Sequence, residues 1–242
     1  AYILAWTTTP WTLPSNVALC VHPEETYVKV KMNENGQVYY LAEALCDSVL
    51  GEGTYQVLES CKGKELEYKE YEPLFPYARV NKKAYYVVCD TYVTLTEGTG
   101  IVHIAPAFGE DDSKVGRRYD LPFVQLVNGK GEMTEETPWV GVFCKKADPM
   151  ILEDLDKRGL LFAAPKFEHS YPHCWRCDTP LIYYARESWF IKMTAVKEDL
   201  IRNNNTINWI PESIGKGRFG DWLENVQDWG ISRNRYWGTP LN

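Results

Sequence analysis

Short apolar runs separated by turn residues recur along the first two thirds of the chain. They span four to six residues, a length typical of strands and too short for most helices. Residues 33–36 (NENG) separate two of them and predict a hairpin, because Asn and Gly accept the positive φ of a tight turn. The predicted strands are residues 2–6, 17–21, 27–32, 38–41, 55–58, 85–89 and 100–105.

Helical periodicity is rarer, and it is clearest over residues 148–158. There three apolar residues share one face, Pro149 stands in the first turn and Gly159 follows the last residue. Strands at this spacing with few helices favour an α+β fold, in which a closed or nearly closed β-barrel has peripheral helices. The other predicted helices are residues 43–50, 111–119, 196–202 and 211–225.

The composition changes at about residue 166, where the chain becomes rich in aromatic residues and interrupted by prolines. We therefore predict two parts: a barrel core over residues 1–165, and an aromatic arm that contains cysteines over residues 166–242. Because the chain begins at Ala1 inside a predicted strand, without an initiator Met, we expect it to be a piece of a longer protein.

The bulk composition is that of a globular chain. With 242 residues and 45% hydrophobic content it can bury a sizeable core. The formal net charge of −7 argues against nucleic-acid binding driven mainly by counterion release, so any such contact must be local. Seven cysteines, mostly isolated, predict reduced thiols and a cytoplasmic protein. No apolar run is long enough to span a bilayer, so we expect no membrane partner.

Residues 6–12 (WTTTPWT) place four hydroxyls within six residues, next to two indoles and a proline. Short hydroxyl side chains of this kind can line a polar pocket. An edge strand of β-branched residues followed by a turn accounts for the same residues, because Pro10 has no N–H to donate to a sheet. The run alone does not decide between these two interpretations.

A second segment, residues 98–112, predicts a strand, a Pro/Gly loop and then a helix that begins with acidic residues. Acidic side chains at a helix start are ordinary caps, and His103 alternates with apolar neighbours along the strand. The chain contains no G-x-S-x-G elbow, no phosphate loop, no G-x-G-x-x-G and no H-E-x-x-H motif. A conventional nucleophile or nucleotide site is therefore not expected.

Together with three later stretches, these two segments resemble the editing insertion, connective peptide 1, of isoleucyl-tRNA synthetases, which are class I aminoacyl-tRNA synthetases. The resemblance covers essentially the whole chain. Valyl and leucyl relatives have an Arg-Pro-containing threonine motif where this chain has TPWT (9–12), which favours the isoleucine type. The five stretches are WTTTPWTLPSN (6–16), GTGIVHIAPAFGEDD (98–112), HSYPHCWRCDTPL (169–181), ESWFIK (187–192) and ISRNRYWGTP (231–240).

The resemblance implies proofreading, that is, hydrolysis of valine wrongly esterified to the 3′ end of tRNA(Ile), with isoleucine rejected by size. A missing methylene is worth only about 1–3 kcal/mol in a hydrophobic pocket, and isoleucyl-tRNA synthetase is the standard illustration of this limit. The implied partners are the tRNA and the catalytic and anticodon-binding domains of the synthetase, to which residues 166–242 return. The ATP-site motifs of class I enzymes are absent, so this chain is not expected to activate isoleucine by itself.

Matched to the motif positions of the family, Asp112 is implied to hold the α-ammonium group of the substrate. Thr7, Thr8 and Thr9 are implied to position the ester, the adenosine and the attacking water. No protein nucleophile is needed, because orienting water against an already labile ester is enough.

Three further residues are implied to bind the substrate. His103, together with Thr9, is implied to shape the pocket that excludes the larger amino acid. Thr12 and Asn16 are implied to hold the threonine segment in place or to contact the substrate.

Cys174 and Cys177 have the spacing of half a tetrahedral zinc site, which needs four ligands. His169 and His173 lie near enough in sequence to complete it, whereas the family supplies a second cysteine pair from outside this insertion. Editing is implied to need no cofactor. The alternative function is a non-catalytic tRNA-binding or zinc-ribbon-like module, which would bind tRNA without hydrolysing the ester.

Overall fold

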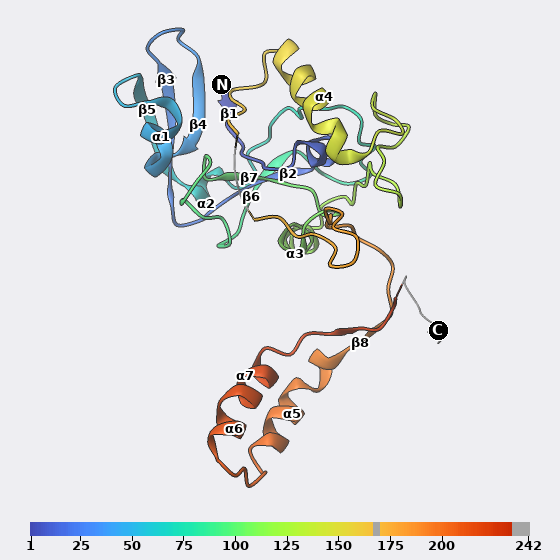
Figure 1. Cartoon of the computed structure of the whole chain (residues 1–242). Coiled ribbons are helices and arrows are strands. Elements are labelled where there is room, and N and C mark those ends of the chain that lie inside the picture. Colours follow the sequence, from blue (N-terminus) through green and yellow to red (C-terminus); the bar gives the residue numbers. More distant parts are fainter. Residues whose placement is uncertain (167–169, 234–242) are drawn as a thin grey trace. The chain divides into compact units, whose positions relative to one another are not determined.

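Figure 1 shows a computed structural model of the chain, which describes residues 1–166 and 170–233. Contacts divide the chain into two compact units, Ala1–Ala185 and Arg186–Asn242. The first unit extends past residue 165, where the composition changes. The functional division into residues 1–165 and 166–242 stays a prediction.

The first unit contains a four-stranded sheet in the order β1 (Tyr2–Ile3), β4 (Val38–Ala42), β3 (Thr26–Met32) and β5 (Tyr55–Lys62). β1 and β4 are parallel, and the other neighbours are antiparallel. The predicted hairpin joins β3 to β4, and Gly36 in its turn has a φ of +71°. Of the turn residues, Gly36 therefore adopts the positive φ that its conformational freedom allows.

A second, three-stranded sheet has the order β6 (Tyr86–Cys89), β2 (Ala18–Val21) and β7 (Ile101–Ile104). β2 lies in the middle, parallel to β6 and antiparallel to β7 (Figure 1). Every residue of β2 and β6 is buried, as expected for strands that are covered on both faces. His103 on β7 lies opposite Leu19 on β2, so this sheet places a histidine in the interior.

All seven predicted strands occur. The first is shorter than predicted, and Trp6 keeps only an isolated bridge to Val102. Among the described residues the two sheets do not close into one barrel, so the fold is a mixed α and β fold and the predicted barrel is not confirmed. The apolar runs determine where strands form, but the pairing of distant segments separates them into two sheets.

The helices of the first unit are short, except for one. η1 (Pro10–Ser15), a 3-10 helix that the sequence did not predict, follows the threonines. The predicted helix over residues 43–50 is divided into a 3-10 turn and an α-helix, and the helix predicted over residues 111–119 is one residue out of place. The remaining helices are η2 (Glu43–Leu45), α1 (Cys46–Leu50), α2 (Gly63–Leu66), α3 (Glu110–Arg118) and α4 (Cys144–Lys157).

Pro149 lies inside α4 and not in its first turn, so this detail of the prediction is wrong. Asp148 followed by Pro149 has the pattern of a helix start, because Asp is a good N-cap and Pro suits the first turn. The helix nevertheless begins at Cys144, because Cys144 and Ala147 are completely buried in the core. Packing therefore overrides the local signal.

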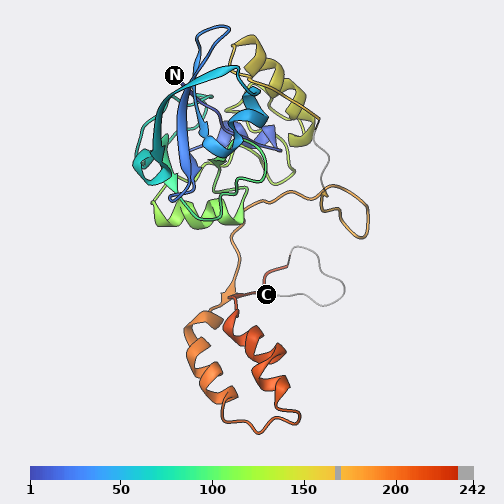
Figure 2. The same cartoon turned by 90° about the vertical axis from the view of Figure 1, so that its left-hand side faces the viewer.

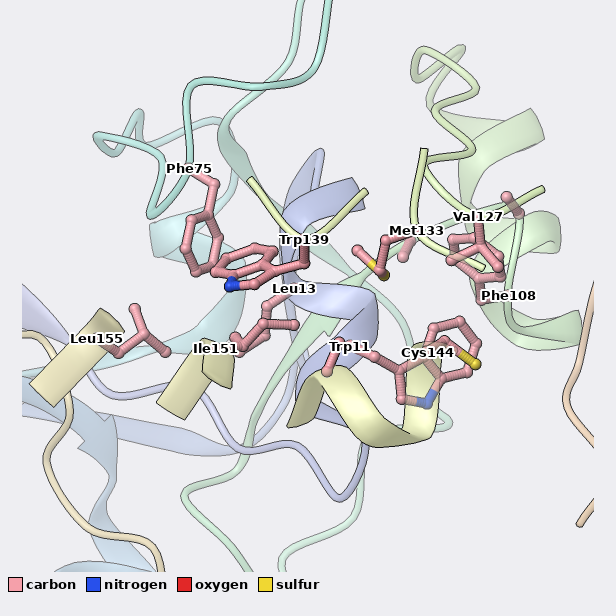
Figure 3. Packing of buried hydrophobic residues seen from close by; sticks show 13 residues of the cluster. Trp11, Leu13, Phe75, Phe108, Val127, Met133, Trp139, Cys144, Ile151 and Leu155 are labelled. Atoms are coloured by element: carbon pink, nitrogen blue, oxygen red, sulfur yellow. The ribbon is translucent and has the colours of Figure 1, made fainter. Parts of the chain in front are cut away.

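The largest core cluster holds η1 against α4. Figure 3 shows Trp11 and Leu13 of η1 close to Cys144 and Ile151 of α4. Trp11 also meets Phe108 edge to face, with ring centroids 4.9 Å apart. The segment that follows the threonines is thus fixed by large apolar side chains on both sides.

The second unit is a small helical assembly, seen in orange and red in Figure 2. Asn204 is buried there; its Nδ2 donates to the Gly215 carbonyl at 2.9 Å and its Oδ1 accepts from Trp209 Nε1 at 2.9 Å. The helix predicted over residues 211–225 is interrupted at Gly217, where a Cβ would lie 2.6 Å from the Ser213 carbonyl oxygen. The elements are β8 (Phe190–Ile191), η3 (Met193–Val196), α5 (Lys197–Asn204), α6 (Ser213–Lys216), α7 (Arg218–Glu224) and β9 (Trp229–Gly230). Within residues 1–166 and 170–233, no helix is long and apolar enough to cross a membrane.

Candidate functional site

The threonine loop, residues 7–12, leaves the edge of the buried sheet. Its preceding residue, Trp6, donates its backbone N–H to the Ile101 carbonyl of β7 at 3.0 Å. Gly98 makes room for the indole, because a Cβ there would lie 2.6 Å from Trp6 Cγ, and its φ is +74°. The start of the loop is therefore fixed next to the strand that holds His103.

The hydroxyls of the threonine loop form a chain that ends on a histidine. Thr7 Oγ1 lies 3.4 Å from Thr9 Oγ1, which lies 3.2 Å from Thr12 Oγ1. Thr12 Oγ1 in turn lies 3.0 Å from His103 Nε2. The loop is therefore a polar pocket wall and not merely an edge strand with a turn.

His103 is neutral, and its tautomer follows from its partner. The residue is only 7% exposed, and burial lowers the pKa of the imidazole to about 4. We assign the single proton of Thr12 Oγ1 to the Thr9 carbonyl, 2.8 Å away, which makes Thr12 the acceptor of a hydrogen bond from His103 Nε2–H. Nδ1 is then a bare acceptor, buried and without a hydrogen-bond partner among the described residues.

Asp112 lies in the first turn of α3, directly after the loop that leaves β7. Its Oδ2 accepts a hydrogen bond from the Ala105 backbone N–H at 2.9 Å. Burial raises the pKa of the carboxyl to about 6; the negative charge of Asp111 adds to this, and the hydrogen bond from Ala105 opposes it. Gly109 leaves the space that the carboxyl occupies, since a Cβ there would lie 2.8 Å from Asp112 Cγ.

These groups converge on one cavity of about 400 Å³, which we call the threonine cavity. Its walls combine hydroxyls, a neutral imidazole and the carboxyls of Asp112 and Glu97 with apolar side chains. A small ligand with a cationic end and an apolar end fits such a lining. The residues predicted for the site that line it are Thr7, Thr8, Thr9, Thr12, His103 and Asp112.

A larger cavity of about 1240 Å³ lies beside it. Asn16 lines this larger cavity together with Thr7, Thr8 and His103, but it does not line the threonine cavity. Its Nδ2 donates to the Ala18 carbonyl at 2.7 Å and its Oδ1 accepts from the Tyr71 hydroxyl, so both ends of the amide are engaged. The two cavities share a wall formed by Trp6, Thr7, Thr8, Glu97, Thr99 and His103.

Tyr92 is a site residue that no sequence motif indicated. It lines the threonine cavity, and its hydroxyl is buried without a hydrogen-bond partner in the part of the chain that the structure describes. Burial raises the pKa of this phenol, and the negative charge of Asp112 contributes. Because Tyr92 belongs to no recognisable motif, only its place in the fold could reveal it.

Cys174 and Cys177 lie in a tight turn. The Cys174 N–H donates to the Thr179 carbonyl at 2.9 Å, and Cys177 Sγ lies 3.2 Å from Thr179 Oγ1. In residues 1–166 and 170–233, no group of three or more side chains is placed to hold a metal ion, and His169 lies outside the described residues. The half-site therefore stays a prediction, which metal analysis of the purified chain would test.

The fold resembles solved editing domains. The crystal structure of GlLeuRS-CP1 superposes with a TM-score of 0.55 at 16% identity, covering 68% of this chain and 84% of that one. The editing domain of the cytosolic leucyl-tRNA synthetase of P. knowlesi gives a TM-score of 0.52 at 15% identity, covering 76% and 84%. At these identities the likeness is one of fold alone. It defines the architectural class as that of synthetase editing domains.

Sequence relatives define the family. The isoleucine–tRNA ligase of Clostridium novyi is 58% identical over 99% of this chain and 23% of its own length. Those of Bacillus thuringiensis and Thermus thermophilus are each 52% identical over 100% of this chain, and over 23% and 22% of their own lengths. The family model described as tRNA synthetases class I (I, L, M and V) matches residues 14–242, so the chain belongs to that family.

The chain spans less than a quarter of the length of these curated relatives. The resemblance to isoleucyl-tRNA synthetases that the five sequence stretches indicated is confirmed.

Proposed function

We propose that this chain is the proofreading domain of an isoleucine–tRNA ligase, and that the threonine cavity hydrolyses valine mischarged onto tRNA(Ile). The observation that supports this most is the convergence of the threonine loop, His103 and Asp112 on one small cavity. These residues come from two separate segments of the chain, residues 6–16 and 98–112, and each segment resembles a motif of the editing domains.

Asp112 binds the α-ammonium group of the ester in this proposal. A carboxyl with a pKa of about 6 is mostly ionised at neutral pH, and an ammonium group nearby favours ionisation further. Because the carboxylate is partly buried, its attraction to a cation is screened less than at the surface. This contact fixes one end of the substrate.

The hydroxyls of the threonine loop then orient the ester and the attacking water. The hydroxyls raise the rate by positioning, because a water held in line with the ester carbonyl can attack without a protein nucleophile. The free ribose hydroxyl of the substrate assists that water in this proposal. The imidazole and Thr9 limit the space for the amino acid side chain, so valine enters and isoleucine does not.

The larger cavity receives the rest of the 3′ end of the tRNA in this proposal, because it shares a wall with the threonine cavity. The tRNA and the remaining synthetase domains are the partners. The seven cysteines form no disulfide within the described residues, which fits a reducing compartment and supports a cytoplasmic location. No cofactor is required.

The decisive experiment measures deacylation of valyl-tRNA(Ile) and isoleucyl-tRNA(Ile) by this chain under single-turnover conditions. Asp112→Asn should lower the rate on valyl-tRNA(Ile) by about 100-fold, since it removes the charge that the ammonium group needs. Asp111→Asn is the matched control, because Asp111 is exposed and pairs with Lys114 at 3.1 Å.

The control should deacylate like the wild type, and all proteins should spare isoleucyl-tRNA(Ile). Full activity of Asp112→Asn would overturn the assignment. Binding of tRNA by the wild type without any hydrolysis would favour the non-catalytic module instead.

A further inference from the structure

The first turn of η1 is capped by a residue far away in the sequence. Thr9 is the N-cap residue of this helix, but its side chain makes no capping hydrogen bond. Pro10 has no N–H, and the Thr12 N–H donates to the Thr9 carbonyl at 3.0 Å. The remaining N–H, that of Trp11, donates to Asp148 Oδ1 of α4 at 2.8 Å.

This arrangement changes what the Thr9 hydroxyl can do. An N-cap threonine ordinarily uses its hydroxyl to accept a hydrogen bond from the second or third N–H of the helix. Here Asp148 takes that place, and Thr9 Oγ1 instead lies 3.2 Å from Thr12 Oγ1 on the wall of the threonine cavity. Because Asp148 caps the helix, the Thr9 hydroxyl remains available to line the cavity.

The position of Asp148 is itself fixed by the core. Its neighbours on α4, Ala147 and Ile151, are completely buried in the same cluster as Trp11. Figure 3 shows Ile151 and Trp11 in this cluster. The Asp148 carboxylate on α4 and the Trp11 N–H on η1 thus lie on two elements that pack together. Their packing fixes the carboxylate relative to the N–H.

We propose that Asp148 is a positioning residue of the threonine cavity, which caps η1 in place of Thr9 and so holds the Thr9 and Thr12 hydroxyls toward His103. Its effect on hydrolysis rests on the proposed function; its effect on the loop does not. The two parts are measured separately.

The first measurement is the ¹⁵N NMR spectrum of the imidazoles, in a chain with four histidines. In the wild type His103 should show a protonated Nε2 and a bare Nδ1. Asp148→Ala should shift the His103 signals, because the Thr12 hydroxyl loses its fixed position. Asp148→Asn, whose amide oxygen still accepts from Trp11, should preserve them, as should Asp156→Ala, which removes an exposed carboxylate from the same helix.

The second measurement is the kinetics of valyl-tRNA(Ile) hydrolysis. Asp148→Ala should lower kcat about 10- to 100-fold, the range expected when a hydrogen bond to a charged group is lost. KM should change little, because Asp112 still binds the ammonium group. Asp148→Asn should restore most of kcat, and Asp156→Ala should not alter it.

Unchanged His103 signals in a folded Asp148→Ala protein would overturn the proposal, whatever the hydrolytic activity. If the signals shift while the wild type hydrolyses nothing, the positioning role stands and the proposed function fails. Asp148→Leu, which fills the volume without an acceptor, replaces the alanine variant if that variant does not fold. Failure of both to fold, with Asp148→Asn folded, would show a role in core stability only and would also overturn the proposal.

Discussion

At the scale of single residues, folding disfavours the charged form of the Asp112 carboxyl in the threonine cavity. The pKa of Asp112 rises from 3.8 to about 6, because burial removes water from the carboxylate. The folded protein therefore binds the Asp112 proton more tightly than the unfolded chain does. The resulting contribution to stability is present below about pH 4 and is lost as the pH rises to about 6.

Asp112→Asn should for this reason stabilise the protein at neutral pH while it lowers the rate of hydrolysis. We expect the free energy of unfolding at pH 7 to exceed that of the wild type by about 1–3 kcal/mol. The gain should shrink toward about pH 3, where the wild-type carboxyl is mostly protonated in both states. Urea denaturation of the two proteins at both pH values measures this, and a gain that does not depend on pH would contradict it.

Most site residues were predictable because they lie in sequence motifs. The threonine loop, His103 and Asp112 were named from their motifs, and the structure brings them together. Asn16 was assigned to the same group and lies in the larger cavity, because its position three residues beyond Leu13 places it at the far end of η1. Tyr92 follows from the fold alone.

At the scale of elements, strands were predicted better than helices. Each apolar run is a strand, because burial of alternate or successive side chains gives a signal within the run itself. η1 was missed, since its two prolines, Pro10 and Pro14, are typical of a turn. Asp148 illustrates the same limit: its pattern correctly indicates a cap, but it caps η1 and not its own helix.

The backbone just before β7 lies close to the Trp6 indole, and this closeness requires the glycine at position 98. Gly98→Ala should cost about 2–4 kcal/mol of unfolding free energy, because the left-handed backbone is strained and the new Cβ meets the indole at 2.6 Å. Gly53→Ala is the matched control, since Gly53 has the same φ of +74° and an added Cβ there would meet no atom within 4 Å.

The control should cost only about 1–2 kcal/mol, which is the backbone strain alone. Thermal unfolding followed by circular dichroism measures both. Equal losses would show that the contact between residue 98 and Trp6 contributes nothing, and the position of the threonine loop would then need another explanation.

At the scale of the whole molecule, every residue that lines the threonine cavity lies in the first unit. A chain that ends at Ala185 should therefore keep the preference for valyl-tRNA(Ile) over isoleucyl-tRNA(Ile). Single-turnover deacylation of both charged tRNAs by the shortened chain measures this. Loss of the preference in a folded protein would show that residues 186–242 take part in discrimination.

The arrangement of the strands into two sheets could not be read from the sequence. β1 pairs with β4, and β2 with β6, as parallel neighbours from distant segments. Such pairings depend on long-range packing, whereas the apolar runs report only local burial. The family resemblance gave the architecture more reliably than the spacing of the strands, which indicated a barrel.

The hydrogen bonds around Thr12 have a direction. If the Thr12 proton goes to the Thr9 carbonyl, as we assign it, then His103 Nε2–H and the Thr9 hydroxyl both donate to Thr12 Oγ1. A carbonyl cannot pass a proton on, so the row of hydroxyls is no proton wire between solvent and the imidazole. The proton released when water attacks the ester must then leave through the ligand or through solvent inside the cavity.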